Sequence, residues 1–265
     1  MVTAMDTAMA MAIATAMEGN KVFFNFHFSF FNSGLLSGST DIHCHLLPHV
    51  DDGAKDYNEA VSVLRWLKKT GIERLYLTPH VMSDFPKNTG IYLTEKFEQF
   101  TKRMENDEIT DIPALKLGAE YMLEATFNIR KEESLLTYAG RHILVETSYL
   151  TPPLGFRDLL DSLIADGNIP ILAHPERYIY MDWNDYQSFK AQKVKYQLNY
   201  LSLTGVYGTH AQKTAAQLLK EGLYDYAGSD IHHLGWHRKN LLLKKLTKKQ
   251  ITQLRPLFQN NRQLW

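Results

Sequence analysis

Several features that would assign a chain to a particular class are scarce or absent here. A single cysteine among 265 residues excludes an intrachain disulfide framework and an all-thiolate zinc site. The 29 basic and 29 acidic residues cancel, so the whole chain has no electrostatic attraction to nucleic acid, and we expect no nucleic-acid partner. No apolar run reaches the ~18 residues of a transmembrane helix, and no P-loop or dinucleotide-binding motif occurs. We therefore expect a cytoplasmic protein without a transmembrane segment.

The first 39 residues differ in composition from the rest of the chain. They contain a Met/Ala/Thr-rich run, Met1–Met17, a polar break, and an aromatic stretch, Val22–Phe31. A signal peptide is not expected, because the run lacks Lys and Arg and contains Asp6. We expect a loosely attached helix, followed by an aromatic segment that docks on the domain or on a partner. Membrane-surface association is the alternative.

After Ser39, short apolar runs alternate with longer amphipathic stretches, which is typical of repeated strand–helix units. In the clearest helix, Asp56–Thr70, Asp56 and Glu59 make a capping-box start and Gly71 is a stop signal. The other expected helices are Leu93–Met104, Phe156–Asp166, Asn184–Gln192, Thr209–Glu221 and Thr247–Phe258. The expected strands are Thr40–Cys44, Arg74–Thr78, Ala114–Ala119, Ile143–Thr147, Ile169–Ala173, Val194–Leu198 and Tyr224–Ala227. Strict alternation predicts an α/β fold with a parallel sheet that closes into a barrel, as one domain over residues 40–265.

Histidines and carboxylates gather at the ends of these expected strands, where barrels of this kind build their active sites. His43 and His45 are two residues apart, so in a strand both imidazoles would point to the same face. The full set of candidate metal ligands is His43, His45, Asp52, His80, Glu120, His174, Asp230 and His232. Mixed imidazole and carboxylate ligands suit Mn, Fe or Zn rather than Ca or Mg. Eight candidates are too many for one ion, so we expect two or three, an arrangement that favours phosphoester hydrolysis.

Two further residues bear on a phosphoester reaction. Arg177 follows His174 by three residues and could reach a phosphate oxygen, although a surface salt bridge explains it equally well. Cysteine catalysis in a C-x5-R loop is excluded, because the position that would need Arg is Val50. Strand alternation also points Cys44 away from the histidine pair, which favours a small core residue.

The motifs DIHCHLLPHVDDGA, LTPH, GAEYML, HILVETS, ILAHPERYIYM and GSDIHH occur in this order between Thr40 and His233. Together they resemble the PHP (polymerase and histidinol phosphatase) superfamily. More closely, they are similar to the metal-dependent protein-tyrosine phosphatases of bacterial capsule and exopolysaccharide loci. Residues 1–39 lie outside the resemblance.

The resemblance implies a distorted seven-stranded (β/α) barrel with a three-metal site, usually manganese, that removes phosphate from tyrosine. The same eight residues would be the ligands, with Arg177 on the phosphate. Among these residues we expect Arg177, Glu120, His45 and Asp230 to take part directly in the reaction. Arg238 is the candidate for a second phosphate-binding arginine. His49 departs from the family, which usually has Gly before DDG; it could crowd the turn, add a donor at the pocket rim, or be a tolerated loop side chain, which we favour.

We expect hydrolysis without a covalent enzyme intermediate, in which a metal-bridging hydroxide attacks phosphorus in line with the phenolate. By resemblance, the substrate is the phosphotyrosine-containing tail of a bacterial tyrosine kinase that controls polysaccharide export. Two alternatives stay open: a small-molecule phosphoesterase such as a histidinol-phosphate phosphatase, and a non-enzymatic binding module. Selectivity for a phenol ring could come from an aromatic rim of Tyr121, Tyr149, Tyr178 and Tyr180, although ordinary packing explains each one as well.

Overall fold

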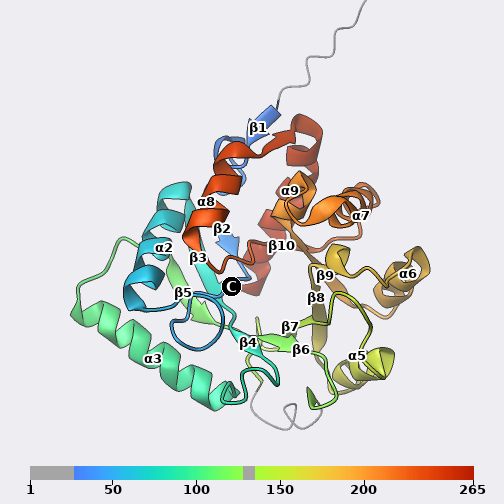
Figure 1. The fold of residues 1–265 in the computed structure, drawn as a ribbon, viewed down its shortest axis with the longest axis horizontal. Coiled ribbons are helices and arrows are strands. Elements are labelled where there is room, and N and C mark those ends of the chain that lie inside the picture. Colours follow the sequence, from blue (N-terminus) through green and yellow to red (C-terminus); the bar gives the residue numbers. More distant parts are fainter. Residues whose placement is uncertain (1–26, 128–134) are drawn as a thin grey trace, which may run out of the picture.

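Parallel strands alternate with helices along the chain in the computed structural model, which describes residues 27–127 and 135–265 (Figure 1). The parallel strands are β2 (Ser39–Asp41), β3 (Ile72–Leu77), β4 (His80–Val81), β5 (Ala114–Leu117), β6 (Glu120–Met122), β7 (His142–Glu146), β8 (Ile169–Ala173), β9 (Lys195–Asn199) and β10 (Tyr226–Gly228). The α-helices are α2 (Tyr57–Thr70), α3 (Gly90–Asn106), α5 (Phe156–Ala165), α6 (Trp183–Ala191), α7 (Gly208–Lys220), α8 (Leu234–Leu243) and α9 (Lys248–Asn260). The expected strands and helices are confirmed to within a few residues at their ends, and α8 is an additional helix.

The parallel strands form two sheets, in the orders β10-β9-β8-β7-β6-β4 and β2-β3-β5. Two of the expected strands are each followed, after a gap of two residues, by a further short strand that the sequence did not predict: β3 is followed by β4 across Thr78-Pro79, and β5 by β6 across Gly118-Ala119. Proline lacks the N–H that would continue a ladder, which accounts for the first gap. Among the described residues the ladders do not close into one sheet. The α/β fold with parallel sheets in a single domain is thus confirmed, whereas the closed barrel is not.

Helix α2 has the two ends that its sequence predicts. The Asp56 side chain accepts a hydrogen bond from the backbone N–H of Glu59 at 2.9 Å, which caps the N-terminus. Gly71 ends the helix with φ 101°, in the left-handed region, and a Cβ there would lie 2.9 Å from Ser37 Cα. Val61, Leu64 and Leu67 are buried along one side, so the helix packs on the sheet through the stripe that the sequence indicates.

The aromatic segment before Ser39 docks on the domain. Strand β1 (His27–Ser29) pairs in antiparallel fashion with β11 (Lys245–Thr247), just before α9. The next residue, Phe30, has no exposed surface, and its ring lies 5.0 Å from that of Tyr200. Of the two expected docking surfaces, domain or partner, the described part of the segment uses the domain. The expected helix at Met1–Met17 lies outside the described residues.

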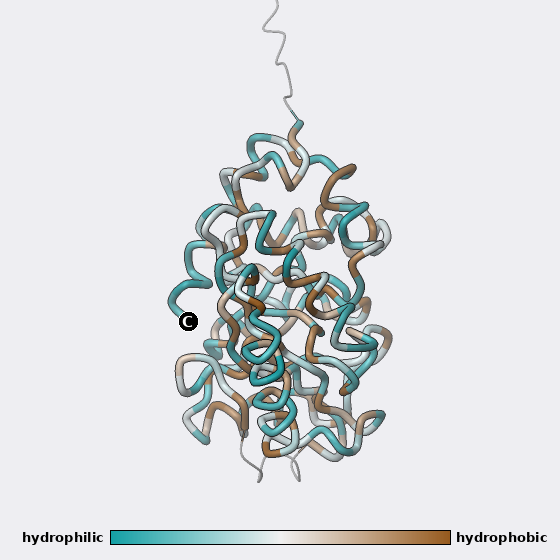
Figure 2. Tube along the Cα trace, turned by 90° about the vertical axis from the view of Figure 1, so that its left-hand side faces the viewer, coloured by the Kyte–Doolittle hydropathy of each residue, from teal (hydrophilic) through white to brown (hydrophobic). Residues whose placement is uncertain are grey.

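One hydrophobic core unites both ends of the described chain with the sheets, since Phe30 and Leu36 belong to the same buried cluster as Leu254 and Phe258. Figure 2 shows apolar segments running through the middle of the molecule and hydrophilic segments along many outer turns. None of the helices in the described ranges is long and apolar enough to cross a membrane.

Replacing Phe30 by Ala should lower the free energy of unfolding by about 3–5 kcal/mol, because a fully buried ring is lost and a cavity is left. Phe31→Ala is the matched control. The ring of Phe31 is next in the sequence and is 44% exposed, so its loss should change the free energy of unfolding by no more than about 0.5 kcal/mol. Urea titrations of the two variants measure the difference. Equal, small effects would mean that the segment does not dock in solution.

Candidate metal centre

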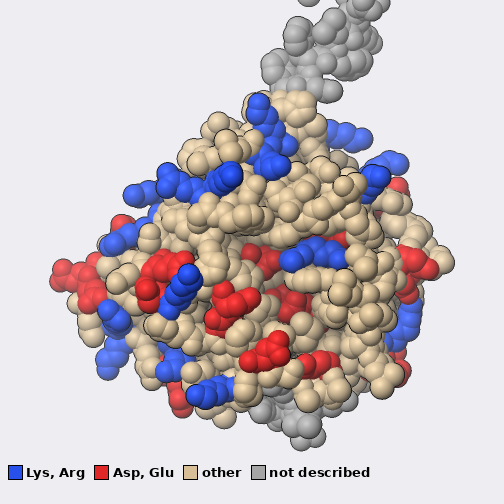
Figure 3. Space-filling view, viewed as in Figure 1, with Lys and Arg blue, Asp and Glu red and all other residues tan. Residues whose placement is uncertain are grey.

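A cavity of about 440 Å³ opens where the parallel strands end. Its walls are formed by Asp52, His80, Glu120, Tyr149, His174, Arg177, Tyr207, Asp230, His232, His233, Trp236 and His237. The strands position several of these residues: His80 begins β4, Glu120 begins β6, and His174 follows β8 directly. Figure 3 shows a hollow near the middle of the molecular face, with acidic side chains in and around it and most Lys and Arg side chains toward the margin.

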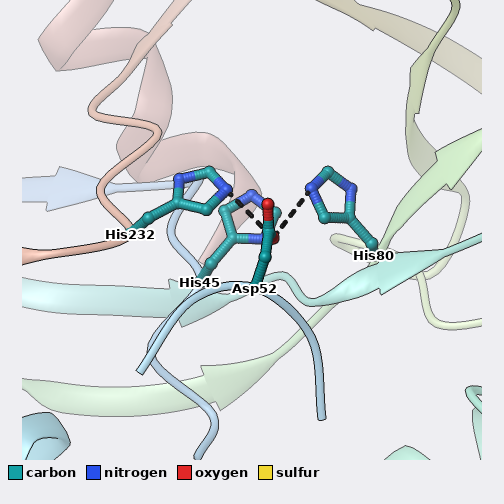
Figure 4. Close-up of side chains that lie close together, drawn as sticks. All are labelled: His45, Asp52, His80 and His232. Atoms are coloured by element: carbon teal, nitrogen blue, oxygen red, sulfur yellow. Dashed lines mark ion pairs between the residues drawn. The ribbon is translucent and has the colours of Figure 1, made fainter. Parts of the chain in front are cut away.

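Among the described residues, four overlapping groups of side chains could each hold a metal ion, because within each group the ligand atoms lie within 4.8 Å of one another. The groups are His45, Asp52, His80 and His232; His43, His45 and Asp230; His43, Glu120 and His174; and His80, Glu120 and Glu146. Figure 4 shows the first group, in which His80 and His232 point toward Asp52 at 3.6 and 3.4 Å. The structure therefore brings together all eight residues that the sequence nominated. That they bind metal stays a prediction.

The H-x-H pair, His43 and His45, places one nitrogen of each ring beside the same carboxylate, Glu120. His43 Nε2 and His45 Nε2 lie 3.2 Å apart, and Glu120 Oε2 lies 3.1 and 3.3 Å from them. The outer nitrogens bind elsewhere: Nδ1 of His43 donates to Gln197 Oε1, and Nδ1 of His45 donates to Asp51 Oδ2, both at 2.9 Å. With a proton held on each outer nitrogen, the inner nitrogen would be the electron-pair donor when a cation takes the place of its proton, as in the orienting pairs around metal-binding histidines.

Asp51 is an orienting residue that sequence reasoning did not single out. Besides His45, its carboxylate accepts hydrogen bonds from the backbone N–H groups of His80 and Gly53, each at 3.0 Å. Gly53 allows the loop to pass this close, because a Cβ there would lie 1.9 Å from the carbonyl oxygen of His45. In the DDG motif, Asp52 thus faces the cavity while Asp51 and Gly53 fix the loop.

Glu146 is the ligand candidate that the sequence-based set omitted. It ends β7 with a buried side chain, and its Oε1 lies 3.0 Å from His80 Nδ1. Its other oxygen lies 3.8 Å from His174 Nε2. The signal that could have found it is its position, since it is a carboxylate at the carboxyl end of an expected strand.

Two residues of the centre have backbone conformations that L-residues rarely adopt. His174 has φ 33° and Asp230 has φ 53°. Such strain costs free energy and persists where the surroundings impose it, which is typical of functional sites. Two hydrogen bonds hold the side chain of Asp230: Arg177 Nη1 and Asn199 Nδ2 donate to its Oδ2 at 2.9 and 3.2 Å.

Burial and close pairing set the charge states in this cluster. Burial by itself disfavours the imidazolium of His43, but the carboxylates of Glu120 and Asp230 outweigh it and raise the pKa of His43 to about 9. Burial alone would raise the pKa of Glu120, yet His43 and His174 hold that pKa well below its usual value. The carboxylates of the cluster are thus ionised, and their negative charge favours positive charge beside them in the interior.

The donor set fits a group of cations. Glu120 Oε2, His80 Nδ1 and Glu146 Oε1 are buried and have no hydrogen-bond partner, although they lie close to one another. Electron-pair donors that converge in this way are stabilised by a positive charge between them. Imidazole with carboxylate is the ligand mixture of Mn, Fe and Zn sites.

Arg177 and Arg238 lie in different places. Arg177 lines the cavity, and its guanidinium is paired with Asp230 rather than being a surface cation. Arg238 lies on α8 and lines a separate hollow with Tyr57 and Trp66. The structure therefore brings Arg177 to the centre and does not bring Arg238 there.

The other sequence-based hypotheses have mixed outcomes. Cys44 is fully buried with its Sγ 3.2 Å from the carbonyl oxygen of Tyr76, and burial raises the pKa of its thiol well above the usual value, as expected of a core residue. His49 is exposed, lines a different hollow and has φ 64°, a conformation that favours glycine. Glycine would adopt this conformation without strain, and the exposed position of His49 agrees with a tolerated loop side chain.

Of the four expected rim tyrosines, Tyr149 is the one among the cavity-lining residues. Tyr121 and Tyr178 are buried in the core, and Tyr180 lines another hollow. The rim is instead completed by Tyr207 and Trp236, which sequence reasoning missed. Both follow strands along the chain, but neither lies in one of the recognised motifs.

Comparisons with known proteins agree with this geometry. The model of the family described as capsular polysaccharide synthesis, CpsB/CapC, matches residues 39–260. The chain is 29% identical over 199 residues to the tyrosine-protein phosphatase YwqE of Bacillus subtilis, covering 73% of this chain and 77% of the relative. It is 26% identical over 203 residues to the tyrosine-protein phosphatase CpsB of Streptococcus pneumoniae, covering 73% and 83%.

A solved structure is also similar. It belongs to a study of YwqE from Bacillus subtilis and CpsB from Streptococcus pneumoniae, described as unique metal-dependent tyrosine phosphatases. The match has a TM-score of 0.66 at 27% identity and covers 75% of this chain and 81% of the other.

Replacing Glu146 by Gln should lower the metal content of the purified protein, because a neutral amide is a much poorer ligand than a carboxylate at the His80 and Glu120 group. Metal analysis after dialysis, with circular dichroism to verify folding, measures the effect. Glu124→Gln is the matched control, since Glu124 is half-buried and accepts a hydrogen bond from the backbone N–H of Ser83, outside the cluster. A folded Glu146→Gln variant with the full metal content would remove Glu146 from the ligand set.

Proposed function

Because this chain belongs to the CpsB/CapC family of capsular polysaccharide synthesis, we propose that it is a metal-dependent protein-tyrosine phosphatase. The observation that carries the proposal is the convergence of four imidazoles on Glu120 beside a cavity that Arg177 also lines. The relatives YwqE and CpsB are named tyrosine-protein phosphatases, which supports the same activity here. The proposed substrate is the phosphotyrosine-containing tail of a tyrosine kinase in capsule or exopolysaccharide synthesis.

The proposed ligands are the eight residues that the sequence nominated, with Glu146 as a ninth. They suit two or three ions, and Mn²⁺ is the proposed metal, with Fe and Zn as alternatives. Bound ions of this kind supply Lewis acidity to phosphoryl oxygens and make water a nucleophile at neutral pH.

The chain's own residues orient and bind the substrate. The Arg177 guanidinium would hold the phosphoryl oxygens, since a fork of N–H donors matches their geometry. Asp230 accepts from Nη1 of Arg177 at 2.9 Å and so fixes the direction of the guanidinium. Asp51 and Gln197 keep His45 and His43 in the orientation in which their inner nitrogens face Glu120. Glu120, His45 and Asp230 thereby act together with Arg177 at the reacting phosphate.

The proposed reaction is direct hydrolysis: water attacks phosphorus, the bond to the phenolic oxygen breaks, and tyrosine and phosphate are released. A cysteinyl-phosphate route has no support, because the single cysteine of the chain is Cys44, which is buried with its thiol pKa raised. The proposed location is the cytoplasm, which a lone free cysteine suits.

We also propose that residues 40–265 form one distorted (β/α) barrel of seven strands, with residues 1–39 as an extension. Counting β3 with β4 and β5 with β6 as interrupted single strands supports this, because each pair passes from one sheet into the other. A parallel bridge between Cys44 and Ile231 supports it as well, since it joins the chain after β2 to the chain after β10, the outer strands of the two sheets.

The test of the function is a comparison of kcat/KM for a phosphotyrosine peptide, a phosphoserine peptide and histidinol phosphate, with the metal-loaded protein. We expect the phosphotyrosine peptide to be preferred and all activity to disappear on chelation and return with Mn²⁺. A preference for histidinol phosphate would assign the protein to the small-molecule phosphoesterases. Full activity in a metal-free sample would remove the metal mechanism, and no turnover at all would indicate a binding module.

Arg177→Ala should lower kcat/KM for the phosphotyrosine peptide. The loss of transition-state stabilisation should be about 1.5–3 kcal/mol, the size of a lost charge-assisted hydrogen bond. Metal content measured on the same sample should be unchanged, which separates phosphate binding from damage to Asp230. Arg157→Ala is the control, because Arg157 is exposed on α5 and pairs with Asp185. An unchanged kcat/KM would make Arg177 a structural residue.

A further inference from the structure

The polar part of the cavity does not distinguish one phosphate monoester from another. Imidazoles, carboxylates and the Arg177 guanidinium would contact the phosphate, which aryl and alkyl monoesters share. Selectivity for a phenol ring therefore has to come from the apolar part of the wall. That part consists of three aromatic side chains, Tyr149, Tyr207 and Trp236, which we call the aromatic wall.

The aromatic wall is built around Arg177. The guanidinium carbon lies 4.2 Å from the ring centroid of Tyr149 and 4.6 Å from that of Tyr207, so both rings pack against the cation. Trp236 extends the wall from Tyr207, with 5.5 Å between the two ring centroids. A phosphate held by Arg177 would thus bring the group attached to it alongside aromatic surface.

Trp236 differs from the two tyrosines in how much of its surface is still available. Tyr149 packs against His174 and Tyr178 as well as Arg177, and the Tyr207 hydroxyl accepts a hydrogen bond from Asn199. Trp236 is the most exposed of the three rings although it lines the cavity, at 46% against 37% for Tyr149, and Tyr207 is half-buried. Exposed aromatic surface at a cavity is the surface that a ligand ring can cover.

The position of Trp236 is fixed by its neighbours. It lies in the first turn of α8, four residues after His232. The next residue, His237, is buried, and its Nε2 lies 3.2 Å from the hydroxyl of Tyr200 in the core. Burial lowers the pKa of His237 to about 3, so this anchor is a neutral imidazole. The indole is therefore held at the cavity by a rigid element that also follows directly on the metal centre.

We propose that Trp236 is a specificity-determining residue whose indole ring stacks on the aryl ring of a phosphotyrosine substrate. The inference rests on the proposed phosphatase function and adds to it the feature that selects aryl over alkyl phosphates. Trp236 has no part in the chemistry of the phosphate itself. Its loss should therefore change discrimination between substrates rather than the reaction as such.

The experiment compares kcat/KM for two peptides of the same sequence, one with phosphotyrosine and one with phosphoserine, using the metal-loaded protein. Trp236→Ala should lower kcat/KM for the phosphotyrosine peptide about tenfold, equivalent to about 1.4 kcal/mol, and change that for the phosphoserine peptide less than twofold. Trp236→Phe should restore most of the loss, because it restores an aromatic face. Leu242→Ala is the matched control, since Leu242 is also on α8 and is 42% exposed.

A binding measurement gives an independent readout. A peptide with the non-hydrolysable phosphonomethyl-phenylalanine should change the tryptophan fluorescence of the wild-type protein, and Trp236→Phe should abolish most of that change. Metal content of each variant shows whether the neighbouring His232 is still intact.

Three outcomes would overturn the inference. Equal losses for both peptides would mean that Trp236 supports the metal centre or Arg177, and no loss would mean that it only packs on Tyr207. If the wild-type protein prefers the phosphotyrosine peptide in either case, the proposed function stands without the inference. If the wild-type protein has no such preference, the proposed function fails and the inference fails with it.

Discussion

The contact between a fully buried carboxylate and the imidazoles around it governs how the interior of this protein is built. Glu120 has no exposed surface, and its oxygens lie 3.1–3.3 Å from nitrogens of His43, His45, His80 and His174. A charge in such a place is very costly unless opposite charge accompanies it. The interior of this protein is therefore organised to receive cations, and the surrounding fold holds the donors in place against their mutual repulsion.

The interruptions of the sheets supply these donors. At Thr78-Pro79 and Gly118-Ala119 a strand leaves one sheet and resumes in the other, and the first residue after each break, His80 or Glu120, faces the centre. Left-handed backbone at His174 and Asp230 turns two further ligand candidates into the same space. The irregular geometry and the candidate metal site are thus two aspects of one arrangement, since a regular sheet would direct these side chains elsewhere.

In the proposed function, phosphate recognition and leaving-group recognition fall to different parts of the cavity. The polar side would hold the phosphoryl group through groups that are indifferent to what it is attached to. The aromatic wall begins at Arg177, where Tyr149 and Tyr207 pack on the guanidinium, and ends at the exposed face of Trp236.

Local chemistry is readable from the chain, and for this reason the strand–helix alternation, the capped ends of α2 and the eight residues of the candidate metal groups follow from the sequence. The capping groups and the H-x-H pair act over a few residues, so their spacing carries the information. Tertiary structure alone decided that Glu146 joins the cluster, that Asp51 and Gln197 orient the histidines, and that Tyr207 and Trp236 rather than Tyr121, Tyr178 and Tyr180 form the wall. It also placed Arg177 in the cavity and Arg238 outside it. Apart from the contact of Asp51 with His45, which is local, these contacts join residues far apart in the sequence, and which of them meet depends on how the two sheets pack, which no local pattern encodes.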